Sequence, residues 1–86
     1  QLSLYQNYPN PFNPSTKIEY SISEASFVQL TVYDILGNTV ETIVNKNLNG
    51  GTYKVTFNAS GFPSGTYFYR LTAGKYSETK KMIIIK

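Results

Sequence analysis

The sequence lacks the side chains on which most small enzymes and metal sites depend. Its 86 residues include no cysteine and no histidine. Without cysteine there is neither a disulfide nor a thiolate, and without histidine the commonest general base and metal ligand are missing. The five acidic residues show no paired or ligand-like spacing, and a domain this small has little room for a cleft. We therefore expect no catalytic residue, no metal and no cofactor.

Charge is scarce as well. Charged residues make up only 15% of the chain, and the net charge is +3, with lysines that cluster only at the C-terminal end. No basic stripe marks a nucleic-acid surface, and no apolar run is long enough for membrane insertion, so we expect neither partner. The lack of cysteine leaves both the cytosol and an exported location open. Gln1 is not a natural start, so we expect a piece of a longer protein whose export signal would lie upstream.

What the sequence does contain is aromatic and apolar residues that alternate with polar ones, a period of two that is typical of half-buried strands. Turn residues separate these runs and predict tight turns at 34–38 and 74–75, a polar loop at 45–51 and a corner loop at 58–65. We expect no helix, and strands at 17–22, 28–34, 39–44, 52–57, 66–72 and the C-terminus. This spacing indicates an all-β fold, an Ig-like antiparallel β-sandwich of about seven strands.

The strand faces follow from the same alternation. The residues that we expect to face the core are Ile18, Tyr20, Ile22, Val28, Leu30, Val32, Tyr53, Val55, Phe57, Tyr67, Tyr69 and Leu71. Tyr67 also begins a strand after the loop GFPSG, as in the tyrosine corner of immunoglobulin-like domains. Its hydroxyl should therefore form a hydrogen bond back to that loop.

A proline-rich lead-in precedes the first alternating run. It holds three of the four prolines, so we assign residues 1–16 to a lead-in that packs on the domain and residues 17–86 to the sandwich itself. Its aromatic residues, Tyr5, Tyr8 and Phe12, are expected to pack down onto the sandwich. The lead-in could serve only as a rigid boundary, or as a fixed joint to an upstream domain.

The C-terminal segment KKMIIIK has too many consecutive apolar residues for one face of a strand. If the turn at 74–75 has two loop residues, Met82 lies opposite Tyr67 on the inner face; with three, Ile83 and Ile85 turn inward instead. In either case one alternate set packs in the core. The other set is either covered by the lead-in or is a recognition surface, and the residues alone leave both open.

The chain resembles the type A C-terminal sorting domain of the type IX secretion system in four segments and in their order. These segments are NYPNPFNPST, VYDILGNTV, GGTYKVTFNASGFPSGTYFYRL and TAGKYSETKKMIIIK. The resemblance runs from Leu4 to Lys86. The chain is also similar to the Ig-like domain of flagellar hook-capping proteins, which is not used as a sorting tail. The motif residues that carry the resemblance are Pro9, Asn10, Pro11, Phe12, Gly65, Tyr67 and Arg70.

The resemblance implies a non-catalytic signal at the end of a larger exported protein. An upstream cargo domain would cross the periplasm, an outer-membrane translocon would recognise the tail, and a sortase-like peptidase would remove it when the cargo reaches the cell surface. We expect the domain to be a monomer. Carried over by position, the residues read by the translocon are Lys80, Lys81, Met82, Ile83, Ile84, Ile85 and Lys86.

One alternative function comes from the outward aromatic residues Tyr33 and Phe68. Exposed aromatic rings can bind sugars or proteins, although single exposed aromatic residues are common. The chain would then be a structural or carbohydrate-binding Ig-like accessory module of an extracellular enzyme.

Overall fold

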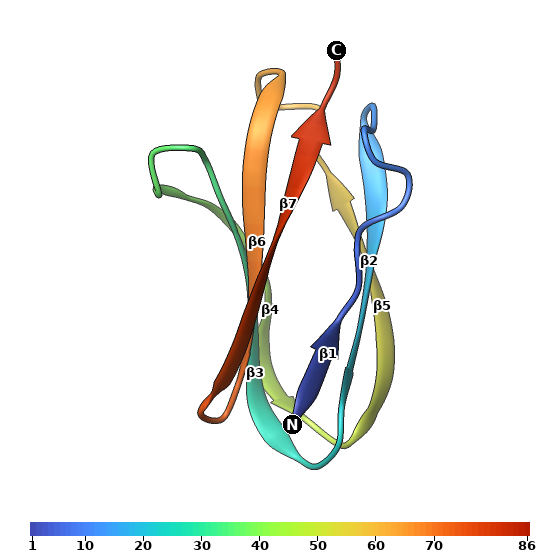
Figure 1. The fold of residues 1–86 in the computed structure, drawn as a ribbon, viewed down its shortest axis with the longest axis vertical. Helices are drawn as coiled ribbons and strands as arrows, with labels where there is room; N and C mark the ends of the chain where they lie inside the picture. Colours follow the sequence, from blue (N-terminus) through green and yellow to red (C-terminus); the bar gives the residue numbers. More distant parts are fainter.

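Two antiparallel sheets face each other across a single apolar core (Figure 1). The computed structural model describes residues 1–86. Its strands are β1 (Leu2–Leu4), β2 (Ser15–Ile22), β3 (Ser26–Tyr33), β4 (Thr39–Leu48), β5 (Gly51–Asn58), β6 (Gly65–Ala73) and β7 (Tyr76–Ile84).

The smaller sheet has the strand order β1-β2-β5, and the larger has the order β4-β3-β6-β7. The consecutive pairs β3–β4 and β6–β7 are hairpins, whereas β2 pairs with β5 and β3 with β6 across the intervening chain. The prediction of an all-β, Ig-like antiparallel sandwich of about seven strands is confirmed. The structure contains no helix that could span a membrane.

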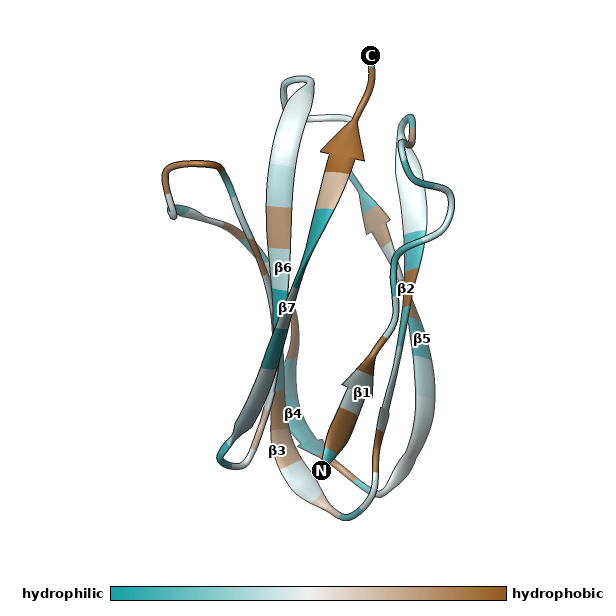
Figure 2. Ribbon diagram, in the orientation of Figure 1, coloured by the Kyte–Doolittle hydropathy of each residue, from teal (hydrophilic) through white to brown (hydrophobic).

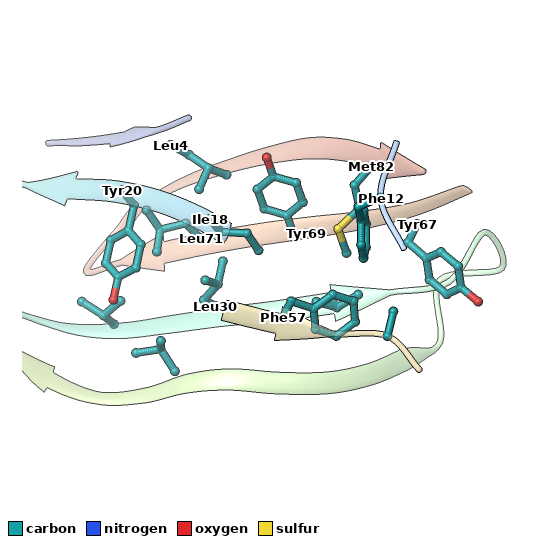
Figure 3. Packing of buried hydrophobic residues seen from close by; sticks show 14 of the residues in the cluster. Leu4, Phe12, Ile18, Tyr20, Leu30, Phe57, Tyr67, Tyr69, Leu71 and Met82 are labelled. Carbon is teal, nitrogen blue, oxygen red and sulfur yellow. The ribbon is translucent and has the colours of Figure 1, made fainter. Parts of the chain in front are cut away.

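Alternate side chains of the strands fill the space between the sheets (Figure 3). In β2 and β3 every residue that we expected to face inward is buried, as are Tyr67, Tyr69 and Leu71 of β6. In β5 only Phe57 is buried, while Tyr53 and Val55 are half-buried and pack against the core. Burial of apolar area on this scale is the main stabilising term of the domain.

The largest difference between the expected and the observed strand boundaries lies in β4. The predicted loop at 45–51 is wrong, because β4 continues to Leu48 and only Asn49 and Gly50 connect it to β5. β4 lies at the edge of its sheet, where one side and one face are open to water, so polar residues such as Asn45 and Asn47 are compatible with it. Pairing with β3, from Val44 opposite Leu30 to Leu48 opposite Ser26, keeps this polar stretch in the sheet.

The lead-in contributes to both the sheet and the core. Within it, β1 pairs with β2, and β2 itself already begins at Ser15. Leu4 and Phe12 are buried, but Tyr8 is 81% exposed and Tyr5 is 48% exposed. The expectation that Tyr5 and Tyr8 pack on the sandwich is therefore wrong. The segment after Leu4 is not a regular strand, and its buried residues are Asn7 and Phe12 instead.

The loop that precedes β6 has the predicted tyrosine corner. The Tyr67 hydroxyl donates a hydrogen bond to the carbonyl oxygen of Pro63 at 2.8 Å. This bond crosses from the start of β6 back to the loop at 58–65, so it fixes the direction in which the chain enters the sheet. The prediction of this bond is confirmed.

Candidate functional site

The turn between β6 and β7 decides which residues of the C-terminal strand face the core. Ala73 pairs with Tyr76, so the turn contains two residues, and Met82 lies opposite Tyr67. Of the two registers that the sequence left open, this is the one that turns Met82 inward. A three-residue loop would have turned the other set of apolar residues inward.

The apolar residues of the tail are consequently divided between the two faces. Met82 and Ile84 are buried, and Met82 lies beside Phe12 in the core (Figure 3). Ile83 points outward and is half-buried, and Ile85 is 51% exposed. The expectation that one alternate set packs in the core is confirmed for Met82 and Ile84.

The lead-in covers the free edge of β7, but not its outer face. Phe12 and Ile84 form a parallel β-bridge. The hydrogen bonds across this edge run from Phe12 N–H to Ile83 O at 3.1 Å, from Ile85 N–H to Phe12 O at 2.9 Å, from Ile83 N–H to Asn10 Oδ1 at 3.0 Å, and from Gln6 Nε2 to Lys81 O at 2.7 Å. An unpaired apolar edge invites strand addition by another chain. These bonds occupy the peptide groups that such an addition would need.

The segment PNPF, residues 9–12, holds the lead-in in this position. The Phe12 side chain is buried and meets the Phe57 ring edge-on, with the ring centroids 6.2 Å apart. Asn10 binds β7 through its side-chain oxygen, and Pro11 is exposed. The carbonyl oxygen of Pro9 accepts a hydrogen bond from Thr16 Oγ1 at 2.8 Å. Each of these contacts joins residues 9–12 to a different part of the domain.

A buried polar network ties the lead-in to β6. The Tyr69 hydroxyl donates to the carbonyl oxygen of Tyr5 at 2.9 Å and accepts from the backbone N–H of Asn7 at 2.8 Å. Asn7 Nδ2 donates to Thr16 Oγ1 at 3.0 Å and to Pro9 O at 3.1 Å. Asn7 and Thr16 are the two buried polar residues of the chain, and no buried side-chain polar atom lacks a partner.

Burial raises the pKa of the Tyr69 hydroxyl to about 12, opposed by the hydrogen bond from Asn7 and reinforced by the charge of Glu78. The hydroxyl therefore stays protonated and keeps both hydrogen bonds at any physiological pH. Sequence reasoning missed this network. The available signal was a tyrosine, rather than a phenylalanine, at an inward position of β6, because a buried tyrosine hydroxyl usually has a partner.

The three C-terminal lysines lie in different environments. Lys80 is half-buried on the inner side of β7 and forms the one ion pair of the domain, with Glu78 at 3.8 Å. Lys81 is exposed on the outer face, directly opposite Phe68 of β6. Lys86 is exposed, and its Nζ donates to the carbonyl oxygen of Ser60 at 2.8 Å. Only Lys81 and Lys86 offer a positive charge without a carboxylate partner here.

The three motif residues of β6 have different structural roles. Gly65 begins β6 at φ +149°, a backbone conformation that residues with a side chain rarely adopt. Tyr67 forms the corner described above, and Arg70 lies on the outer face. There its guanidinium sits 5.5 Å from the centroid of the Tyr33 ring. This contact occupies one face of Tyr33, which disfavours that ring as a platform for a sugar.

The carboxylates do not gather into a site. Hydrogen bonds lower the pKa of Asp34, the largest from the backbone N–H of Asn38, and one more from Leu36. Asp34 is thus the turn residue that the sequence predicted. No group of three or more His, Cys, Asp or Glu side chains lies close enough to hold a metal ion.

Comparison with known proteins connects these features to a family. The family model described as the secretion system C-terminal sorting domain matches residues 6–86. An endo-acting ulvan lyase from Formosa agariphila is 33% identical over 79 residues, which are 92% of this chain and 14% of the lyase. The chain thus spans about one-seventh of the length of that relative.

Proposed function

Because the chain belongs to the family of secretion system C-terminal sorting domains, we propose that the accessible side chains at the end of β7 are what the outer-membrane translocon reads. Domains of this family are sorting signals for type IX secretion and direct the export of the larger protein that carries them. The finer assignment concerns the seven C-terminal residues. In this assignment some of these residues contact the translocon, and the others hold the contacting residues in place.

The observation that carries this proposal is the division of the tail between the core and the surface. Lys81, Ile83, Ile85 and Lys86 are accessible in the folded domain, whereas Met82 and Ile84 are buried. We assign recognition to the accessible set. Met82 and Ile84 act indirectly by anchoring the strand, and the half-buried Lys80 lies at the margin of the surface.

The closed edge of β7 supports recognition through side chains. A translocon that added a strand to β7 would first have to displace the lead-in from its hydrogen bonds with Ile83 and Ile85. The folded domain instead offers two lysines beside two isoleucines. We assign residues 9–12, Gly65 and Tyr67 to the support of this surface, whereas Arg70 lies exposed on the outer face beside it.

The resemblance extends the proposal to the fate of the protein. The carrier of this signal is exported to the cell exterior or the cell surface. We propose that it passes through the periplasm, that a sortase-like peptidase removes the tail, and that the domain acts as a monomer. We also propose that the domain itself catalyses nothing, because its role is to be recognised.

Export of a reporter fused to residues 1–86, in a host with the type IX system, tests the proposal. Deleting residues 80–86 also removes Met82 and Ile84 from the core, so surface substitutions give a sharper test. We expect Lys81→Glu combined with Ile85→Ser to lower the fraction of reporter outside the cell. The matched control is Lys46→Glu combined with Phe27→Ser. Lys46 is exposed, as Lys81 is, and Phe27 is 48% exposed, which is similar to the 51% of Ile85. Equal export of the two double variants would refute the assignment.

A further inference from the structure

A hollow on the outer face of the larger sheet lies next to the proposed recognition surface. It is an open depression of about 480 Å³, lined by Tyr33, Phe68, Arg70, Thr79 and the turn at 34–37. We name it the β3–β4 hollow. Phe68 pairs with Lys81 across β6 and β7, so the hollow and the outer face of β7 form one continuous surface.

One wall of the β3–β4 hollow is unusually apolar. Ile35 is 70% exposed and Leu36 is 83% exposed, in a turn that projects away from the sheet and is coloured as strongly hydrophobic in Figure 2. Residues at such a tip are ordinarily polar. Adjacent exposed apolar residues beside a hollow are typical of a contact with another molecule.

Hydrogen bonds fix the backbone of the turn that presents these two side chains. Asp34 Oδ1 accepts hydrogen bonds from the backbone N–H groups of Leu36 and Asn38, both at 2.9 Å. The N–H of Gly37 donates to the carbonyl oxygen of Asp34 at 3.0 Å, and its φ of +88° suits glycine. The exposure of Ile35 and Leu36 is therefore built into the turn. A surface presented in this way costs little ordering entropy when it binds.

The opposite wall carries positive charge. The Arg70 guanidinium lies over the Tyr33 ring at 5.5 Å, and its Nε donates to Thr79 Oγ1 at 3.4 Å, so its orientation is fixed from two sides. Neither Arg70 nor the neighbouring Lys81 forms an ion pair with any carboxylate. Asp34 directs its carboxylate into its own turn. Arg70 is thus free to bind a carboxylate through both terminal nitrogens.

We propose that the β3–β4 hollow binds an acidic segment of a protein of the type IX machinery. In this segment an apolar side chain enters the hollow between Leu36 and Phe68, and a nearby carboxylate binds Arg70. The inference rests on the proposed function, because it extends the surface that the translocon recognises from β7 across β6 to β3. The concave shape of the hollow favours a protein segment over a lipid surface.

Export of the reporter fusion separates this inference from the proposed function. We expect Ile35→Ser combined with Leu36→Ser, and separately Arg70→Gln, to lower export about tenfold, as for the loss of interface anchor residues. Arg70→Lys should have an intermediate effect, because lysine keeps the charge but not the planar fork. The matched control is Tyr8→Ser, which removes an 81% exposed aromatic ring from the lead-in beside β2 and should leave export unchanged.

The outcomes point to different conclusions. If the parent fusion is not exported, the proposed function fails and this inference fails with it. If the parent fusion is exported and the variants in the hollow match both the parent and the Tyr8→Ser control, only the inference is overturned. The substituted side chains are exposed, so we expect the variants to unfold at the same temperature as the parent domain. An unchanged midpoint of thermal unfolding would show that the variants are folded.

Direct contact provides a second test. A photoreactive benzophenone amino acid at position 36 should cross-link to an Asp- or Glu-containing peptide of a secretion-machinery protein, and the same group at position 8 should not. The cross-link at position 36 should fall about tenfold in the Arg70→Gln background. Equal cross-linking from positions 36 and 8 would overturn the inference. Flotation of the domain with phosphatidylglycerol vesicles, abolished by the Ile35→Ser and Leu36→Ser pair, would also overturn it, in favour of a lipid surface.

Discussion

Replacing Tyr69 with phenylalanine removes a single oxygen atom that joins the lead-in to β6. The hydroxyl has two partners, the carbonyl oxygen of Tyr5 at 2.9 Å and the backbone N–H of Asn7 at 2.8 Å. The ring itself would keep its place in the core. The substitution therefore isolates the polar contribution of this contact from the apolar one.

The expected cost follows from what the two partners lose. The N–H of Asn7 is buried and would be left without an acceptor, which costs about 1–3 kcal/mol. Tyr5 is 48% exposed, so water can partly replace the bond to its carbonyl oxygen, and that loss costs about 0.5–1 kcal/mol. Together we expect Tyr69→Phe to lower the free energy of unfolding by about 1.5–4 kcal/mol.

Urea denaturation of residues 1–86 measures this change. Tyr33→Phe is the matched control, because the Tyr33 hydroxyl has no hydrogen bond to the protein, and it should shift the free energy of unfolding by less than about 0.5 kcal/mol. Amide hydrogen exchange adds a local readout. The amides of Ile83 and Ile85, which donate to the lead-in, should exchange faster in Tyr69→Phe than in Tyr33→Phe. Similar stability of the two variants, with unchanged exchange at these amides, would refute the reasoning.

Three further predictions concern the core, the corner and pH. Met82→Ala should lower the free energy of unfolding by about 2–5 kcal/mol, and Ile85→Ala by less than about 0.5 kcal/mol, in the same urea assay; similar costs would contradict the division of the tail. Tyr67→Phe should cost about 1 kcal/mol through the lost bond to Pro63, and an unchanged urea midpoint would argue against the corner. The pKa of Tyr69 is about 12 in the folded protein and about 10 in an unfolded chain, so the unfolded state loses its proton first as the pH rises. Stability should be complete below about pH 10 and fall by roughly 2–3 kcal/mol between about pH 10 and 12, and Tyr69→Phe should remove this part of the pH dependence.

The strands and most core residues could be predicted because alternation is a local property of the chain. Ile18, Tyr20 and Ile22 face inward whatever lies beside β2, since successive side chains of a strand point to opposite faces. The register of the final hairpin could not be predicted in this way. A glycine followed by lysine is compatible with loops of two or three residues, and only the pairing of Ala73 with Tyr76 decides between them.

The contacts of the lead-in could not be predicted because they join distant parts of the sequence. Asn7 and Tyr69 are 62 residues apart, and no spacing rule connects them. For the same reason the sequence left open whether the lead-in covers the C-terminal strand. The structure gives a divided result, in which the lead-in covers the free edge of β7 and leaves Ile85 on its outer side 51% exposed.

The bonds between the lead-in and β7 also have a consequence for the order of folding. Asn10 and Ile83 are 73 residues apart, so their contact closes nearly the whole chain into a loop. Contacts of such wide separation carry a large loop-closure entropy and slow the folding of β-sandwiches. The edge of β7 is consequently completed only when the first and last segments have met. A machinery that reads this end of the domain would therefore read the completion of folding together with the identity of the signal.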